Sequence, residues 1–112
     1  MADNYLSSIA VADTERSLAI PASSTYSALG TPFPHNPVII IFDNQGTVSA
    51  QISFDGVNPW KTFTAGEAFV LDMRANHGQG STWTFPIGTQ VYVNGTAGAT
   101  GNFKVSILYA GN

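Results

Sequence analysis

Charge is scarce in this sequence. Charged residues make up 10% of its 112 residues, against about 25% in an average soluble domain. The net charge is −3, and the four cations are scattered along the chain. A protein that binds nucleic acid through its phosphates needs a concentrated basic surface, so we expect no nucleic-acid partner. Two explanations fit the low charge: a surface largely covered by neighbouring proteins, or a neutral, threonine-rich β-sandwich.

Cysteine and long apolar runs are also missing. Without cysteine, the chain forms neither disulfides nor thiolate metal sites. No run approaches the length that crosses a bilayer, and the N-terminus lacks a basic region followed by an apolar one. We therefore expect a soluble protein that is made in a cytoplasm and has no membrane partner.

Helical periodicity is absent, and strand patterns take its place. Residues 38–42 form a continuous β-branched and aromatic run after Pro37, which is typical of a central strand buried on both faces. Residues 43–46 read as a turn. The alternation that follows sends four apolar side chains to one side: Val48, Ala50, Ile52 and Phe54. Together, residues 37–56 predict a β-hairpin.

Further short strands are expected along the rest of the chain, at 16–20, 26–29, 58–63, 67–74, 89–94 and 103–110. A short helix beginning at residue 13 is the alternative for the first of these, although Pro21 would end it within two turns. Residues 95–102 read as a glycine-rich hairpin loop. The pattern predicts a single all-β domain, an antiparallel, jelly-roll-like β-sandwich of seven or eight strands.

Within that domain, we expect residues 1–36 to form an extended N-terminal arm with edge strands, and residues 37–112 to form the sandwich body. The arm carries four apolar side chains without an obvious place in the sandwich: Tyr5, Leu6, Ile9 and Val11. The predicted core is Ile39, Ile41, Val48, Ile52, Phe54, Phe69, Leu71, Val91, Val93, Val105 and Ile107.

Candidate catalytic groups have ordinary structural explanations. The acids of the predicted body, Asp43, Asp55, Glu67 and Asp72, read as turn formers or solvated strand residues. His35 and His77 lie far apart in loops, without metal-ligand spacing. No nucleophile elbow and no phosphate-binding loop is present. We therefore expect no enzyme activity, no metal and no cofactor.

Three aromatic residues are candidates for a binding surface: Trp60, Trp83 and Tyr92. An exposed planar ring stacks on a sugar or anchors a protein interface, while core packing is the structural alternative for at least one tryptophan. Asn94-Gly95-Thr96 matches a glycosylation sequon, which we discount because the chain shows no secretion signal.

Several segments in a fixed order carry a family resemblance. They are IIFDNQGTV at 40–48, SFDG at 53–56, AGEAFVLD at 65–72, PIGTQVYV at 86–93 and GNFKVSILY at 101–109. Over roughly residues 37–110 the chain resembles small β-sandwich virion proteins of tailed bacteriophages. The resemblance implies a structural protein that decorates the capsid exterior and cements neighbouring capsomers.

The implied partners are the major capsid protein or another virion protein, and the chain itself as a homotrimer. The arm and the three aromatic residues are then the expected partner-binding groups. Two alternatives stay open: a neck, tail or fibre-base component, and a carbohydrate-binding sandwich that recognises host-surface glycans.

Overall fold

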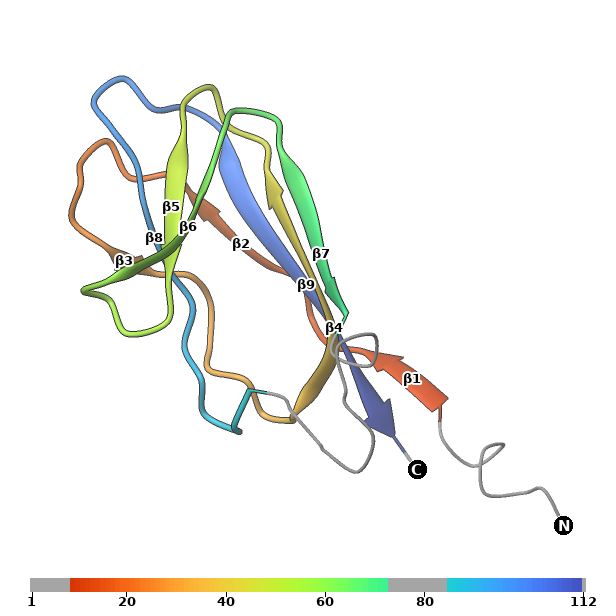
Figure 1. The fold of residues 1–112 in the computed structure, drawn as a ribbon. Coiled ribbons are helices and arrows are strands. Elements are labelled where there is room, and N and C mark those ends of the chain that lie inside the picture. Colours follow the sequence, from red (N-terminus) through yellow and green to blue (C-terminus); the bar gives the residue numbers. More distant parts are fainter. Residues whose placement is uncertain (1–8, 73–84, 112) are drawn as a thin grey trace, which may run out of the picture.

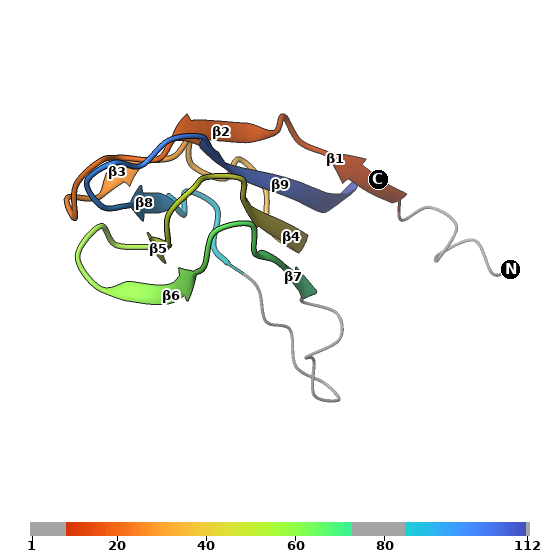
Figure 2. The same cartoon turned by 90° about the horizontal axis from the view of Figure 1, so that it is seen from above.

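The fold consists of two antiparallel sheets packed face to face, which confirms the all-β sandwich prediction. The computed structural model describes residues 9–72 and 85–111, and these residues contain strands and no helix. Accordingly, no helix that could cross a membrane occurs in them. Figure 1 shows the strands, and Figure 2 shows the two layers from above.

The larger sheet has five strands in the order β1-β9-β4-β7, with β2 also paired to β9. Their bounds are β1 Ile9–Ala12, β2 Arg16–Ala19, β4 Pro37–Asn44, β7 Ala68–Asp72 and β9 Asn102–Gly111. Because β1 and β2 pair with successive parts of β9, they act as one interrupted edge strand. The smaller sheet has the order β3-β8-β5-β6. Its bounds are β3 Ser27–Ala28, β5 Ala50–Ser53, β6 Pro59–Phe63 and β8 Tyr92–Asn94.

This strand order is that of a jelly roll. With β1 and β2 counted together, residues 9–72 and 85–111 contain eight strands, of which the first pairs with the last, β3 with β8, β4 with β7 and β5 with β6. The pairs alternate between the two sheets, as in a long hairpin rolled around a barrel-like core. The order therefore resolves the choice between a simple sandwich and a jelly roll.

The core lies between the sheets and is rich in aromatic residues. Five of the predicted core residues are buried there: Ile52, Val91, Val93, Val105 and Ile107. Four others are partly buried against it: Val48, Phe54, Phe69 and Leu71. The prediction was wrong for Ile39 and Ile41, because Ile40 and Phe42 are the β4 residues that point inward. An unbroken apolar run contains no alternation that would set which side faces the core.

The predicted hairpin over residues 37–56 is also wrong. Its two strands form, but β4 belongs to the five-stranded sheet and β5 to the four-stranded sheet. The buried side chain of Asn44 ties this corner together, since its amide donates to the carbonyls of Val48, Phe63 and Thr64 at 3.0, 3.2 and 3.0 Å. The turn therefore carries the chain from one sheet to the other.

The glycine-rich loop at 95–102 makes the same crossing, from β8 to β9, so it is not a hairpin loop either. It packs against the β4–β5 corner, where Gln45 and Thr47 donate their backbone N–H groups to Asn102 and Thr100. Gly101 has φ +87°, and a Cβ atom there would lie 2.7 Å from the carbonyl oxygen of Gln45. Glycine is required at this close contact.

The segment before residue 37 supplies more than an arm. The predicted strands at 16–20 and 26–29 are confirmed as β2 and β3. Arg16 is 5% exposed, and its Nε donates to the carbonyl of Thr31 at 2.8 Å. Its guanidinium also forms an ion pair with Asp13 and lies over the ring of Phe33. Arg16 therefore fixes this segment to the loop that leads into β4.

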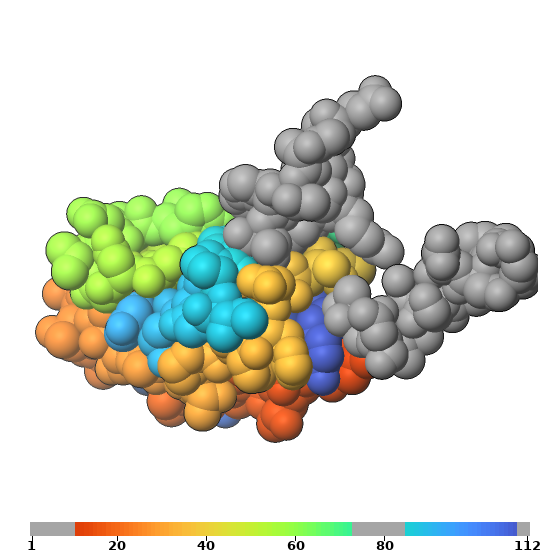
Figure 3. Space-filling model, turned by 90° about the horizontal axis from the view of Figure 1, so that it is seen from below, coloured from red at the N-terminus to blue at the C-terminus, as the bar shows by residue number. Residues whose placement is uncertain are grey.

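One end of the sandwich is closed by two loops that are distant in the sequence. Figure 3 shows residues around 30–36 beside residues 85–90. The backbone of Phe33 donates to Thr89 and accepts from Gly88, while the side-chain amide of Asn36 donates to the carbonyl of Phe85 at 2.8 Å. These loops leave the two outer faces of the sandwich as the main accessible surfaces.

Candidate functional site

The carboxylates lie apart from one another. Asp55 shapes the turn after β5, where one of its oxygens accepts from the backbone N–H groups of Val57 and Asn58 at 2.8 Å each. These bonds hold the pKa of Asp55 well below its usual range. Its interpretation as a turn former is confirmed. Among residues 9–72 and 85–111, no group of three potential metal ligands gathers.

Glu67 has an equally local role in the turn before β7. Its carboxylate accepts from the backbone N–H of Thr64 at 2.9 Å and pairs with Lys61 at 3.2 Å. The N–H of Thr64, followed by Lys61, lowers the pKa of Glu67. His35 stacks on Tyr109 with ring centroids 4.0 Å apart, and His77 lies outside the described residues. These groups stabilise turns and strand ends.

Of the seven predicted partner-binding residues, the four that the structure describes do not form one site. Tyr5, Leu6 and Trp83 lie outside the described residues. Ile9 and Val11 belong to β1, whose backbone pairs with β9, so this part of the expected arm is an edge strand of the larger sheet. Trp60 and Tyr92 lie on β6 and β8, separated by β5.

Trp60 mainly serves packing. Its ring centroid lies 5.2 Å from that of Phe42, 5.3 Å from Phe54 and 6.0 Å from Phe69, and 39% of the residue is exposed. It covers the aromatic core where β6 and β7 form the open side of the sandwich. Tyr92 lies against Gly56, where an added Cβ would be 3.4 Å from the ring. The structural alternative for the tryptophans is thus supported at Trp60.

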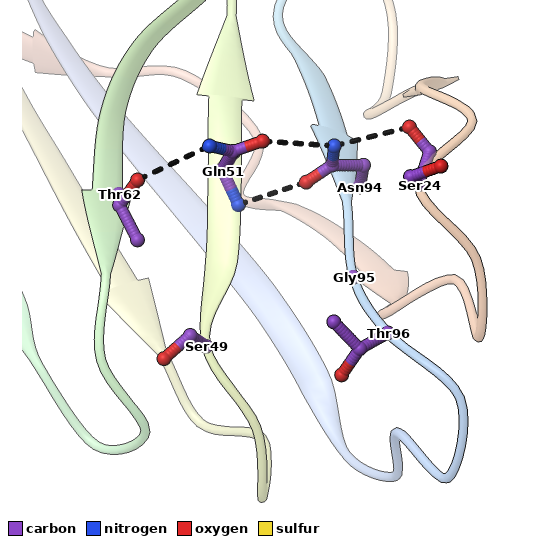
Figure 4. A pocket seen from close by; sticks show the side chains of 7 residues that line it. All are labelled: Ser24, Ser49, Gln51, Thr62, Asn94, Gly95 and Thr96. Carbon is purple, nitrogen blue, oxygen red and sulfur yellow. Dashed lines mark hydrogen bonds between the residues drawn. The ribbon is translucent and has the colours of Figure 1, made fainter.

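A neutral polar pocket lies on the outer face of the four-stranded sheet (Figure 4). It measures about 300 Å³ and is lined by Ser24, Ser49, Gln51, Thr62, Asn94, Gly95 and Thr96. The amide of Asn94 donates to Gln51 Oε1 and to the Ser24 carbonyl at 3.1 Å each, and the amide of Gln51 donates to Thr62 at 3.3 Å. Asn94 is thus buried in a row of hydrogen bonds. This structural role explains why an asparagine occupies the first position of the sequon, without a need for glycosylation.

The outer face of the five-stranded sheet has the opposite character. Ile39, Ile41, Val70 and Leu108 point away from the core, because their chain neighbours Ile40, Phe42, Phe69, Leu71 and Ile107 pack into it. We call these four residues the apolar face. Ile41 lies beside Val70, and Ile39 lies beside Leu108. Val70 is 56% exposed, and the other three are partly exposed.

Charged side chains border the apolar face. Lys104 and Asp43 are neighbours across β9 and β4 at one end, and Asp72 is the neighbour of Ile39 at the other. Glu15, beyond β9, accepts a hydrogen bond from Ser106 at 3.3 Å. In the described parts of the chain, no strand or loop crosses this face (Figure 2). A contiguous apolar surface with a charged rim is typical of a protein interface.

Sequence reasoning missed this face for one reason. It recognised that β4 is apolar on both sides, but it expected both sides to be covered within one chain. A two-layer sandwich buries only one side of each sheet, so the two layers that the described residues form leave the second apolar side of β4 uncovered. A strand that is apolar on both sides, in a chain long enough for only two layers, was therefore the sequence signal for an exposed apolar face.

Comparisons with known proteins identified no relative from which a function could be inferred. No protein-family model matches the sequence, and no curated protein matches it.

Proposed function

We propose that this chain is a non-enzymatic structural protein of a bacteriophage virion, which sits on the capsid exterior and helps to hold neighbouring subunits together. The observation that carries the proposal is the apolar face on a rigid five-stranded sheet. Four aliphatic side chains on adjacent strands, which no other part of residues 9–72 and 85–111 covers, favour a lasting contact with another protein. The ordered resemblance of the segments between residues 40 and 109 to phage virion proteins supplies the virion context.

The architecture suits a protein that must resist mechanical force. Each sheet is tied to the other at buried corners, such as that of Asn44, so the body resists deformation as one unit. The low charge of the chain limits repulsion between closely packed copies. The expected partners are the major capsid protein or another virion protein, together with further copies of this chain.

The test is to locate the chain on the particle. Virions from its source are purified, the chain is quantified by mass spectrometry, and a cryo-EM reconstruction is searched for the jelly-roll density. We expect a fixed copy number per particle and density that bridges capsid subunits. Wild-type protein added to particles that lack it should restore the density. A chain that is abundant in infected cells but absent from purified virions would contradict the proposal.

The second candidate is recognition of a neutral glycan, which the polar pocket favours. Hydroxyl and amide side chains line the pocket without any charged group, and such side chains match the hydroxyl groups of a sugar. Its volume lies at the lower end of the range of about 300 to 1,000 Å³ for small-molecule sites. Because neither Trp60 nor Tyr92 lines it, stacking on those rings is not part of this candidate.

This candidate is tested by NMR titration with a panel of neutral monosaccharides. Saturable shifts of the side-chain amide signals of Gln51, lost in Thr62→Val, are expected if a sugar binds there. Ser27→Ala, an exposed hydroxyl deletion on β3 outside the pocket, is the matched control. Shifts that never saturate, or that persist in Thr62→Val, would remove the candidate.

A further inference from the structure

We propose that the apolar face pairs with the same face of a second copy of this chain, across a two-fold axis that runs parallel to the strands between β4 and β9. The inference rests on the proposed structural function and deepens it, since it names the partner of that face.

The register of the sheet arranges the outward-pointing residues, that is the apolar face and its charged rim, in three rows across the strands. The first row contains Ala68, Asp43, Lys104 and Ser17. The second contains Val70, Ile41 and Ser106, and the hydrogen bond of Ser106 places Glu15 at its end. The third contains Asp72, Ile39, Leu108 and Ala12. A two-fold parallel to the strands keeps each row opposite itself and exchanges β4 with β9.

Applied to the first row, this symmetry creates two opposite-charge contacts. Lys104 of one copy faces Asp43 of the second copy, and Asp43 of the first faces Lys104 of the second. Lys104 forms no salt bridge with any residue in the described ranges, so its charge is available for this contact. A like-charge pair would disfavour the dimer, and none arises in the other two rows.

The remaining rows bring apolar groups together. Leu108 of each copy faces Ile39 of the other, and Ile41 of each copy faces Ser106 of the other. Val70 faces the Glu15 position, where the aliphatic part of the glutamate side chain can cover it. The same surface on both copies therefore complements itself, which is the defining property of a two-fold interface.

A two-fold perpendicular to the strands fits less well. It would place the first row of one copy over the third row of the other, so Lys104 would face Leu108 and Asp43 would face Ile39. Both charges would then lose water against aliphatic groups without gaining a partner, which is costly. Charge complementarity selects the axis parallel to the strands.

The dimensions of the face fit a weak, reversible dimer. Four strand columns about 4.8 Å apart and three rows that run from Lys104 to Leu108, at about 3.4 Å per residue, give a face of roughly 20 by 17 Å per copy, or about 350 Å². Two such faces together bury about 700 Å², below the range of about 1,200 to 2,000 Å² for stable specific interfaces, so we expect association only toward millimolar concentration. Pairing through the edge at β6 is less favourable, since Pro59 and a bulge between Ile52 and Ser53 interrupt its ladder.

The first experiment measures association by sedimentation velocity from low micromolar to millimolar concentration. We expect a monomer–dimer equilibrium for the wild-type chain. Val70→Asp should weaken the dimer at least about tenfold, because the change occurs twice and brings each new carboxylate opposite Glu15. Val57→Asp is the matched control, since Val57 is 73% exposed in the loop before β6 and remote from the face. It should leave the dissociation constant unchanged.

The second experiment tests the axis by exchanging the charges. Lys104→Glu and Asp43→Lys should each weaken the dimer about tenfold or more, and the double variant should recover most of the loss because the pairs re-form in reversed order. Circular dichroism and the thermal midpoint of each variant show that folding is intact. If the two-fold axis were perpendicular to the strands, the double variant would not recover the affinity of the dimer.

Four outcomes overturn the inference: a monomer at every concentration, a dimer indifferent to Val70→Asp, charge reversals without recovery in the double variant, or a trimer. A trimer is the state that the family resemblance implies, and its three-fold symmetry does not pair the apolar face with itself. The virion role fails separately, when the chain is missing from particles although the dimer forms in solution.

Discussion

At the scale of single residues, Asn44 has the greatest structural consequence. Its side chain is fully buried and makes four hydrogen bonds, three as a donor to backbone carbonyls and one as an acceptor from the N–H of Gly46 at 2.9 Å. Removing the side chain takes one donor from each of the three carbonyls, of which the Thr64 carbonyl keeps the backbone N–H of Glu67 at 3.0 Å.

We expect Asn44→Ala to lower the free energy of unfolding by about 2 to 4 kcal/mol, since the substitution removes the four hydrogen bonds of the side chain and each such bond contributes about 0.5 to 1.5 kcal/mol. Urea denaturation followed by tryptophan fluorescence measures the change. The control is Asn102→Ala, an exposed asparagine with one side-chain bond, to Ser17, which should cost less than about 1 kcal/mol. Equal effects at both positions would contradict this role of Asn44.

Residue-level prediction from the sequence worked where the pattern alternates. Val105 and Ile107 on β9 and Ile52 on β5 were assigned to the core because polar neighbours separate them. It failed on β4, where Ile39 and Ile41 are apolar like the true core residues Ile40 and Phe42. It also missed Arg16, because a buried arginine depends on carbonyl partners such as that of Thr31, far away in sequence.

At the scale of elements, the turn from Ser53 to Asn58 is organised by one carboxylate. Asp55 accepts from two backbone N–H groups, from the Ser53 hydroxyl at 2.8 Å and from the Asn58 amide at 3.0 Å. Because the folded-state pKa of Asp55 is lowered, the unfolded chain binds more protons at acidic pH. Folding stability from this group is therefore present above the unfolded pKa of about 3.9. It is lost as the pH falls through the folded-state pKa.

Asp55→Asn should accordingly lower the thermal midpoint at pH 6, and the gap to the wild-type chain should narrow below about pH 4. Differential scanning calorimetry between pH 2 and 7 measures both curves. Glu67 shifts in the same direction, so the variant keeps part of the acid dependence. A gap that stays constant with pH would show that Asp55 acts through turn geometry and not through its charge.

Turns were easier to predict than their destinations. The glycine and Asx signals at residues 43–46 and 95–102 correctly located changes of chain direction. In both places the next strand joined the opposite sheet. Whether a turn closes a hairpin or crosses between sheets depends on tertiary partners, here the contacts of Gln45 and Thr47 with the loop before β9, and a local pattern does not contain them.

At the scale of the whole molecule, the two outer faces differ in kind. One carries a neutral polar pocket built from side-chain amides and hydroxyls, and the other carries the apolar face. The class of fold followed from many short strands without helices, while the pairing of the first strands with the last required long-range contacts. The candidate site was even harder to predict from the sequence, because the apolar face consists of the apolar residues that the core does not bury, and the core itself depends on the tertiary structure.

The central place of β9 also orders events during synthesis. β1, β2 and β4 all hydrogen-bond to β9, which follows all three of them in the sequence. Until residues 102–111 emerge, β4 lacks one of its two neighbours and exposes an apolar run on both sides. The nascent chain therefore cannot close its larger sheet before β9 is translated, and an apolar strand without its neighbour is prone to aggregation until then.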